Sequence, residues 1–458
     1  MVRWRIGILL SVAIAISYLD RQTLPVAIKA IQADIPISNQ TLAFLNSAFL
    51  FAYALMYLGG GKLMDTIGTR RGFALTMLIW SLACASHGLA ANVAMLVVSR
   101  LLLGLGEGGG FPAATRAIAE WFPSRERSMG MGMVNGGSAI GGMLAPPLIS
   151  LVLMRTGWFH LAGWRWVFFV TGAIGLIWTI WWLAAYCLPQ DHPRISSSER
   201  ELIAGAPPSA AEPAEAPIEP PANATRTLPY ARRLPNDPFA LPNAGKITYA
   251  DLLSHRETFG LLLAKFFSDA AWFFYLFWLP KFLYDAHHFD IKSVGAIAWL
   301  PHVAAGIGCL CGGGLSSLLL FRGRSLNFSR KIAMATSALM MPLLILVPHV
   351  PVLWAIGIFC VGYFGHQSWS TVVMTLPTDL FPRSAIGTVA GMVGFAGAMG
   401  GVVFGQIAGY MLDHHMGYGP VFVIFGTLHP IALALLLVMV PRVGALMAEP
   451  ATPVGAVM

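Results

Sequence analysis

The segment "EWFPSRERSMGMGMVNGGSAIGG" (residues 120–142) decides the fold, because a related segment follows in the second half of the chain. It aligns without gaps on "DLFPRSAIGTVAGMVGFAGAMGG" (residues 379–401), where the Phe-Pro pair, a Gly-Met-Val triplet and the closing Gly-Gly pair coincide. The offset is 259 residues at both ends, since position 122 matches 381 and position 141 matches 400. The chain therefore contains two copies of one structural unit.

The composition around this repeat is typical of a helical membrane protein. The 458 residues are 56% hydrophobic and 11% charged, with a mean hydropathy of +0.68, whereas a soluble domain carries roughly 25% charged residues. Long continuous apolar runs favour helices over the alternating segments of a membrane barrel. Runs of about the 20 residues that a spanning helix needs fall near residues 6–30, 41–63, 72–91, 93–119, 128–153, 164–187, 257–284, 292–318, 330–348, 351–377, 385–412 and 418–440.

These runs predict an all-α membrane protein of about twelve helices in two pseudo-symmetric bundles. We expect an N-terminal six-helix bundle over residues 1–190 and a C-terminal one over residues 257–441. Residues 191–256 form the cytoplasmic linker, largely disordered because its Pro/Ala/Glu-rich part buries too little apolar surface to fold. Residues 442–458 form a cytoplasmic tail. Duplicated bundles imply a transporter whose site lies at the repeat interface, near the middle of the bilayer.

The net charge of +8 follows the membrane topology and needs no nucleic-acid partner. Basic residues cluster in alternate loops, while the loops at 87–93 and 348–352 contain no Lys or Arg. Since basic residues mark the cytoplasmic side, both termini are expected in the cytoplasm.

Four of the charged residues inside the predicted spans form one candidate set. The run from Ile6 to Leu19 is too short to cross a bilayer, so its helix must continue through Asp20 and Arg21. Arg100 and Glu107 are seven residues apart on a later helix, which places them on one face about 10 Å apart along the axis. Charges at such depth usually face a polar cavity and mark a functional site. A structural ion pair, or a charge reaching outward to water, are the alternatives for Asp20 and Arg21.

Two acids and two bases in one cavity have the parts of a proton-coupled anion carrier. Protonation of one acid leaves an excess positive charge that can receive an anion. Arginine suits a substrate carboxylate because its planar fork matches the two oxygens.

The loop "GGKLMDTIGTRRG" (residues 60–72) resembles the signature loop of the major facilitator superfamily. Thr66 departs from that pattern, since a basic residue is common there. The resemblance implies that the matching residues form a gate. These residues are Gly61, Asp65, Gly68, Arg70 and Arg71.

The charged helices resemble the anion:cation symporter branch of that superfamily, which holds sialin and the vesicular glutamate and bacterial sugar-acid transporters. The motif "SYLDRQTLPVA" and the later positions of Tyr53, Arg100 and Glu107 carry the resemblance. It implies that Arg21, with Tyr18 and Tyr53, holds the substrate carboxylate. It further implies that Asp20 and Glu107 carry the coupling protons and that Arg100 tunes Glu107.

The segments at 269–291 and 365–382 look most like bacterial hexuronate transporters. Four residues are expected to complete the substrate site, namely Asn135, Ser138, Trp369 and Ser370. Ser138 departs from the aldonate carriers, which often place a glutamine there. Lys281 and Asp269 are expected at the outer gate, and the aromatic residues near Trp272 are expected to serve packing.

The sequence therefore predicts a monomeric proton symporter of the bacterial inner membrane that imports a small carboxylate by alternating access. The expected substrate is a hexuronate (galacturonate or glucuronate) or an aldarate. Another organic anion, such as tartrate, an aldonate or an aromatic acid, remains an alternative, and so does an efflux antiporter. No HExxH, GxSxG or CxxC motif suggests an enzyme. No cofactor or metal is expected, because the five cysteines stand in or beside apolar runs.

Overall fold

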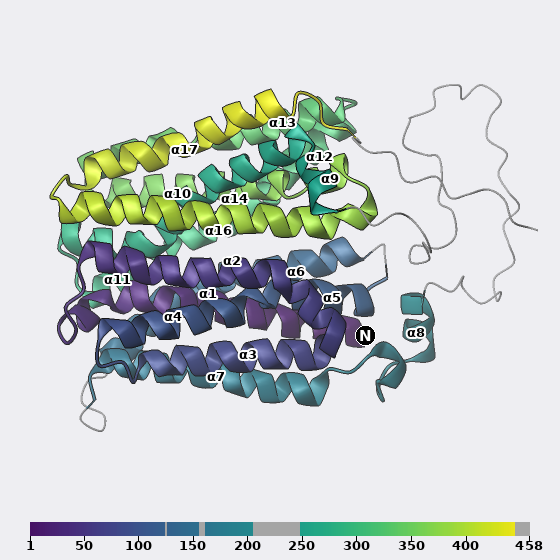
Figure 1. The fold of residues 1–458 in the computed structure, drawn as a ribbon, viewed down its shortest axis with the longest axis horizontal. Coiled ribbons are helices and arrows are strands. Elements are labelled where there is room, and N and C mark those ends of the chain that lie inside the picture. Colours follow the sequence, from purple (N-terminus) through teal and green to yellow (C-terminus); the bar gives the residue numbers. More distant parts are fainter. Residues whose placement is uncertain (124–125, 155–160, 205–247, 445–458) are drawn as a thin grey trace, which may run out of the picture.

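The computed structural model describes residues 1–123, 126–154, 161–204 and 248–444, and every regular element in these ranges is a helix (Figure 1). The predicted disorder of the linker concerns mainly residues 205–247, which lie outside the described ranges.

The first half of the chain forms six long passes, of which the fourth is interrupted at Gly109. Its elements are α1 (Val2–Gln32), α2 (Asn39–Ile67), α3 (Thr69–His87), α4 (Val93–Gly108), α5 (Gly110–Trp121), α6 (Arg127–Leu153) and α7 (Gly163–Ala185). The short elements η2 (Pro189–Asp191) and α8 (Ser197–Ala204) follow.

The second half repeats this plan after the short α9 (Tyr249–Leu253). Its long elements are α10 (Arg256–His287), α11 (Ile291–Ile297) with α12 (Leu300–Phe321), α13 (Leu326–Ala338) with η3 (Met341–His349), α14 (Val352–Val373), α16 (Arg383–Asp413) and α17 (Tyr418–Met439). The short α15 (Leu376–Leu380) precedes α16.

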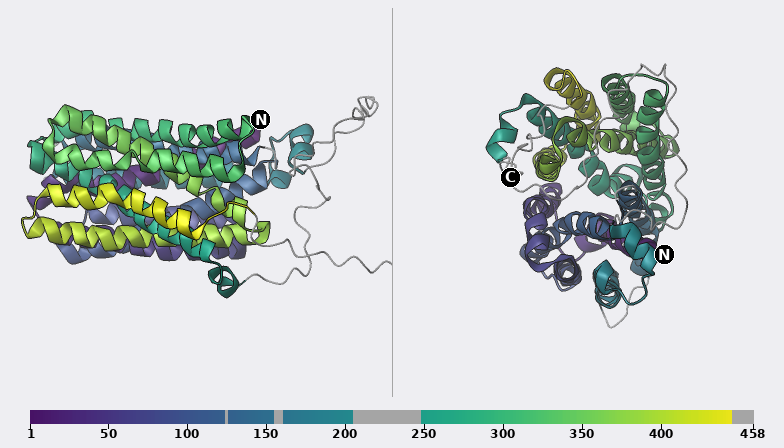
Figure 2. Two further views of the ribbon diagram at one scale, coloured as in Figure 1. Left: turned by 90° about the horizontal axis from the view of Figure 1, so that it is seen from above. Right: turned by 90° about the vertical axis from the view of Figure 1, so that its right-hand side faces the viewer.

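Ten of the described passes are long and apolar enough to cross a membrane. The helices α3 and α14 complete the set of twelve, because they are 19 and 22 residues long and pack on α7 and α12 of their own halves. The helices run along the long axis of the molecule, and the two halves of the chain occupy separate halves of it (Figures 1 and 2). The predicted all-α architecture is therefore confirmed.

The repeated glycines explain why both halves fold alike. A Cβ at Gly141 of α6 would lie 2.1 Å from the carbonyl oxygen of Ala15 on α1. A Cβ at Gly400, its counterpart on α16, would lie 1.8 Å from the carbonyl oxygen of Phe266 on α10. Both distances are far below contact, so only glycine lets these helix backbones approach so closely.

The next glycine of each repeat faces the opposite half. Gly142 lies against His302 of α12, and Gly401 lies against Leu50 of α2. The contacts of α6 with α12 and of α16 with α2 are thus related by the same pseudo-symmetry. These helices frame the space between the halves, where the candidate site lies.

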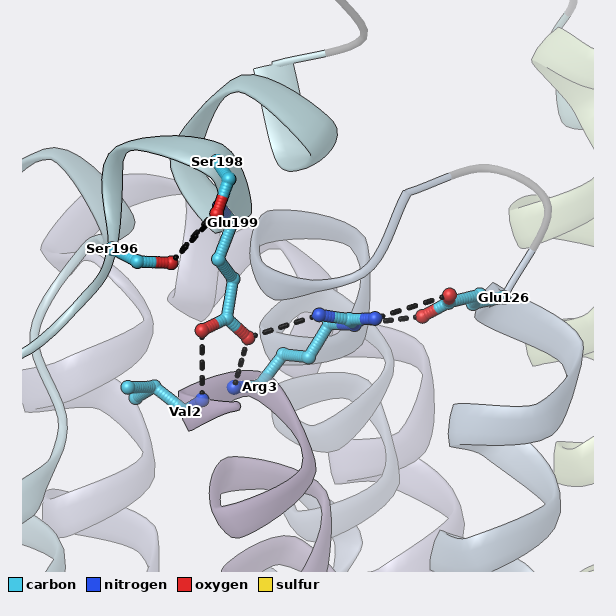
Figure 3. Close-up of polar contacts among 6 residues, drawn as sticks. All are labelled: Val2, Arg3, Glu126, Ser196, Ser198 and Glu199. Atoms are coloured by element: carbon cyan, nitrogen blue, oxygen red, sulfur yellow. Dashed lines mark hydrogen bonds and ion pairs between the residues drawn. The ribbon is translucent and has the colours of Figure 1, made fainter. Parts of the chain in front are cut away.

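Glu199 joins the segment after α7 to the start of α1 (Figure 3). Its carboxylate accepts hydrogen bonds from the backbone nitrogens of Val2 and Arg3 at 2.9 and 3.1 Å. The guanidinium of Arg3 pairs with Glu199 at 3.0 Å and with Glu126 at 2.7 Å. This network satisfies donors of the first turn of α1, which have no partner within the helix.

Candidate functional site

A cavity of about 1230 Å³ lies between the two halves and is lined by residues of both. It extends to the terminal end of the bundle, which we define as the end where α1 begins and α17 finishes. Lys62, Tyr249 and Thr375 line it there. At its inner part lie Tyr18, Arg21 and residues of α10.

Arg21 and Glu107 form a buried ion pair in the N-terminal half. The Nε of Arg21 lies 2.6 Å from Oε2 of Glu107, and the two side chains are 3% and 0% exposed. Ser17 donates a second hydrogen bond to the same oxygen at 2.7 Å. No hydrogen bond joins the terminal nitrogens of Arg21 to a described residue, so these donors are available to a ligand.

Two tyrosine rings flank this guanidinium. The Cζ of Arg21 lies 4.8 Å from the ring centroid of Tyr18 and 4.6 Å from that of Tyr53. Both tyrosines line the cavity. The expected grouping of Tyr18, Arg21 and Tyr53 is therefore present as geometry, and the three form one wall that can hold an anion by charge and hydroxyl contacts.

Asp20 and Arg100 lie behind this wall and do not line the cavity. The indole nitrogen of Trp80 donates to Asp20 at 3.1 Å. Arg100 is fully buried, and no hydrogen bond joins its guanidinium nitrogens to a described residue. The predicted quartet is thus a direct Arg21–Glu107 pair with two further buried charges beside it.

The expected sugar-binding residues divide into two groups. Asn135 and Ser138 of α6 and Ser370 of α14 line the cavity. Trp369 is fully buried and lies outside the lining, with its ring 5.9 Å from that of His429. The two neighbours differ because successive residues of a helix point in directions about 100° apart.

A second ion pair, which the sequence analysis did not identify as a substrate site, lines the cavity from the C-terminal half. The Nζ of Lys265 lies 2.7 Å from Oδ1 of Asp269 and 3.1 Å from Oγ of Ser370. A lysine and an aspartate four residues apart in an apolar run were the available signal, since such residues share a helix face. Asp269 was expected at the outer gate, but it lies beside this cavity instead.

Residues 60–72, expected as a loop, are helical except at Gly68, because α2 continues to Ile67 and α3 begins at Thr69; this junction lies at the terminal end. Gly61 lines the cavity, and Gly68 has a φ of +79°, a conformation that favours glycine. Arg70 donates to the carbonyl oxygen of Leu183 at 2.5 Å, while Arg71 is exposed. The side chain of Asp65 lies outside the described part of the chain.

The opposite end of the bundle, which we call the far end, is closed by contacts between the halves. Asp285 of α10 accepts from Lys29 of α1 at 3.1 Å, from Lys281 at 2.5 Å and from Tyr418 at 3.0 Å. Asp413 of α16 accepts from the backbone nitrogens of Asn39 and Gln40, both at 2.8 Å. Lys281, which the sequence analysis expected at the outer gate, lies among these contacts at the far end.

Comparison with known families supports a transporter. The family model described as Major Facilitator Superfamily matches residues 10–405. The hexuronate transporter of Escherichia coli K12 is 29% identical over 92% of this chain and 90% of its own. The galacturonate transporter of Dickeya chrysanthemi is 31% identical over 74% of this chain and 89% of its own. A probable galactarate/D-glucarate transporter of E. coli K12 is 27% identical over 93% and 91%.

Solved structures of transporters share the fold. The inward-open xylose transporter of E. coli has a TM-score of 0.68 at 14% identity, covering 96% of both chains. A bacterial homologue of the human lysosomal transporter Spinster, in an inward-facing unoccupied conformation, has a TM-score of 0.66 at 16% identity, covering 96% of this chain and 95% of its own.

Proposed function

This chain belongs to the Major Facilitator Superfamily, and we propose that it is a proton-coupled symporter that imports a sugar acid, a hexuronate or an aldarate, across a bacterial inner membrane. Membership makes the chain a multi-pass membrane transporter and not an enzyme. The observation that carries the proposal is the Arg21–Glu107 pair, in which Arg21 lines the cavity with two nitrogens left for a ligand and Glu107 is buried behind it.

The pair couples an anion to a proton through charge balance. While Glu107 is ionised, it neutralises Arg21, and an incoming carboxylate meets no net positive charge. When Glu107 takes a proton, the guanidinium is freed and can bind the carboxylate in a bidentate manner. Proton and anion therefore favour each other's binding, and this thermodynamic coupling is reciprocal.

The rest of the site suits a polyhydroxy acid. Tyr18 and Tyr53 add hydroxyl groups beside the guanidinium, and Asn135, Ser138 and Ser370 add hydrogen-bonding groups from both halves. The resemblance to hexuronate, galacturonate and galactarate carriers agrees with this chemistry. Asp20 is a second candidate to carry a proton, since it is buried beside the pair.

Transport requires the two halves to rock about this cavity. We assign the terminal end to the cytoplasm, following the distribution of basic loops, so the described conformation is open inward and closed at the far end. Reopening the far end requires the contacts of Asp285 and Asp413 to break. The junction of α2 and α3, with Gly61 and Arg70 on either side of it, would then meet the other half as an inner gate.

The test is uptake into proteoliposomes of galacturonate, galactarate, tartrate and benzoate, with and without an inward proton gradient. We expect gradient-driven uptake of a sugar acid by the parent protein and its loss in Arg21→Ala. Lys292→Gln, an exposed charge change on α11, is the control that should behave as the parent. Uptake of tartrate or benzoate alone would replace the substrate but keep the mechanism. Uptake indifferent to the gradient and to Arg21→Ala would refute the proposal.

A further inference from the structure

The C-terminal half contributes its own ion pair to the cavity, Lys265 with Asp269 on α10. These side chains are only 7% and 13% exposed, yet both line the cavity. Lys265 also donates to Ser370, which uses two of the three donors of an ammonium group. One donor of Lys265 is left for another partner, and Oδ2 of Asp269, which packs on Gly397, makes no hydrogen bond to a described residue.

A continuous set of contacts places this pair across the cavity from Arg21. The ring of Tyr53 lies beside Arg21 and 5.6 Å from the ring of Tyr57. Tyr57 packs on Gly394 of α16, where a Cβ would lie 2.6 Å from its ring. Asp269 packs on Gly397, where a Cβ would lie 2.3 Å from its Oδ2. Since Gly394 and Gly397 are less than one helical turn apart, Arg21 and Asp269 face the same compartment.

His366 lies near Asp269 and is itself packed between His429 and Trp272. The Nε2 of His366 lies 3.9 Å from Oδ1 of Asp269, and its Nδ1 lies 3.1 Å from Nε2 of His429. The ring of Trp272 stacks on His366 with centroids 4.7 Å apart. Trp272, which was expected to serve packing, packs on His366 and also lines the cavity.

The charge balance of this subsite tells which ligand end it accepts. Lys265 is already neutralised by Asp269, so the subsite carries no free positive charge for a carboxylate. A second carboxylate on the ligand would instead meet Asp269, and like charges brought together are strongly unfavourable. A neutral hydroxyl fits both groups, because it can donate to the aspartate while it accepts from the lysine.

We propose that the Lys265–Asp269 pair is the subsite for the hydroxyl-bearing end of the substrate, and that it makes the carrier selective for sugar acids with one carboxylate over diacids. This inference rests on the proposed function, in which Arg21 holds the single carboxylate. Within the proposed substrate class, the inference favours hexuronates over aldarates. The similar proteins include transporters named for either class and do not decide between them.

The experiment measures how unlabelled galacturonate and galactarate compete with labelled galacturonate in proteoliposomes. In the parent protein, galactarate should compete at least about tenfold more weakly, a difference of about 1.4 kcal/mol. Asp269→Asn frees the charge of Lys265 and should improve the relative competition by galactarate by about tenfold. Lys265→Gln leaves Asp269 unpaired and should weaken the competition by galactarate further.

The two single variants should shift the relative competition by galactarate in opposite directions. Misfolding would instead lower the transport of both acids together. The double variant Lys265→Gln/Asp269→Asn keeps a donor and an acceptor without charge, so it should retain galacturonate uptake with reduced discrimination. Lys292→Gln is the matched lysine control.

Equal competition by both acids in the parent, or the same ratio in all variants, would overturn the subsite while leaving the proposed function standing. Absence of uptake of every sugar acid in the parent would contradict the proposed function and this inference with it.

Discussion

Glu107 is the residue whose charge decides whether Arg21 is free to bind a carboxylate. The Nε of Arg21 lies 2.6 Å from Oε2 of Glu107, and both side chains are buried, so water screens their charges little. Ser17 also donates to Glu107, so the carboxylate is held in place from two sides.

Glu107→Gln should mimic the protonated state permanently, because the amide keeps the shape and removes the charge. We expect this variant to exchange internal for external substrate while losing gradient-driven accumulation by at least about tenfold. Counterflow of labelled galacturonate at equal pH measures the first property, and uptake under a proton gradient measures the second. Full accumulation by Glu107→Gln would exclude this residue from coupling.

Sequence reasoning reached the charged residues of the N-terminal half but not all of their partners. Spacing alone placed Arg100 and Glu107 on one face of α4, yet Glu107 pairs with Arg21 of another helix. Lys265 was not predicted to line the site, and Trp369 was predicted to line it but does not, and both differences have the same cause. The face that a helix turns toward a cavity depends on its neighbours, and these are long-range contacts that a local pattern does not contain.

At the repeated glycines, two helices approach so closely that no side chain fits between them. Gly400→Ala would place a Cβ 1.8 Å from the carbonyl oxygen of Phe266. We expect a loss of about 1–3 kcal/mol in the free energy of unfolding, the range for overpacked sites. Gly357→Ala on α14 is the matched control, because a Cβ there meets nothing within 4 Å.

Alanine favours a helix over glycine, so Gly357→Ala should leave the melting temperature unchanged or raise it. Thermal unfolding in detergent, followed by fluorescence of the tryptophans, compares the two variants. Equal melting temperatures would contradict the close approach of α10 and α16.

The contact of Glu199 with the start of α1 gives a pH-dependent contribution to stability. Burial acts to raise the pKa of Glu199, but the backbone nitrogens of Val2 and Arg3, with the Arg3 guanidinium, lower the pKa below its ordinary value. A lowered pKa means that the stabilisation is present above the pH at which an unfolded glutamate ionises, about 4.3. It is lost as the pH falls through the lower folded value.

Glu199→Gln should therefore destabilise the protein at pH 7 by roughly 1 kcal/mol, the typical effect of losing a helix cap. The difference from the parent should shrink as the pH falls below about 4. Chemical unfolding at several pH values measures it. A difference independent of pH would show that the charge of Glu199 has no part in the contact.

The bounds of the elements were predicted closely, since the length of an apolar run fixes a spanning helix. Runs expected at residues 6–30 and 418–440 became α1 (Val2–Gln32) and α17 (Tyr418–Met439). The break between α4 and α5 was not predicted. Gly109 lies there against Thr76 of α3, where a Cβ would be 2.6 Å away. Pro112 has no N–H to donate to the carbonyl of Gly108, which accounts for the break.

The molecule as a whole is closed at the far end by a small number of polar contacts between its halves. Asp285→Asn removes the charge that joins Lys29 of one half to Lys281 of the other. We expect a larger share of molecules with the far end open. Spin labels at Leu89→Cys and Met416→Cys, both exposed at that end, report the separation.

The parent should show a short distance and Asp285→Asn an added longer one, in a background with the native cysteines replaced. Identical distance distributions would mean that Asp285 does not hold the far end closed. The double-labelled protein should retain transport, which serves as the functional control.

The internal repeat allowed the two-bundle architecture to be predicted from the sequence. The constant offset between the two repeat segments predicted two alike halves, and Gly141 and Gly400 make equivalent contacts. The conformation was beyond prediction, because the same sequence must support both open states by only small differences in free energy.

The most direct test of the central claim is proton movement on addition of substrate. Proteoliposomes loaded with a pH-sensitive dye, at equal pH on both sides, receive galacturonate outside. The account predicts internal acidification in the parent protein and none in Arg21→Ala or Glu107→Gln. Uptake of galacturonate by the parent without any acidification would contradict coupling of the anion to a proton.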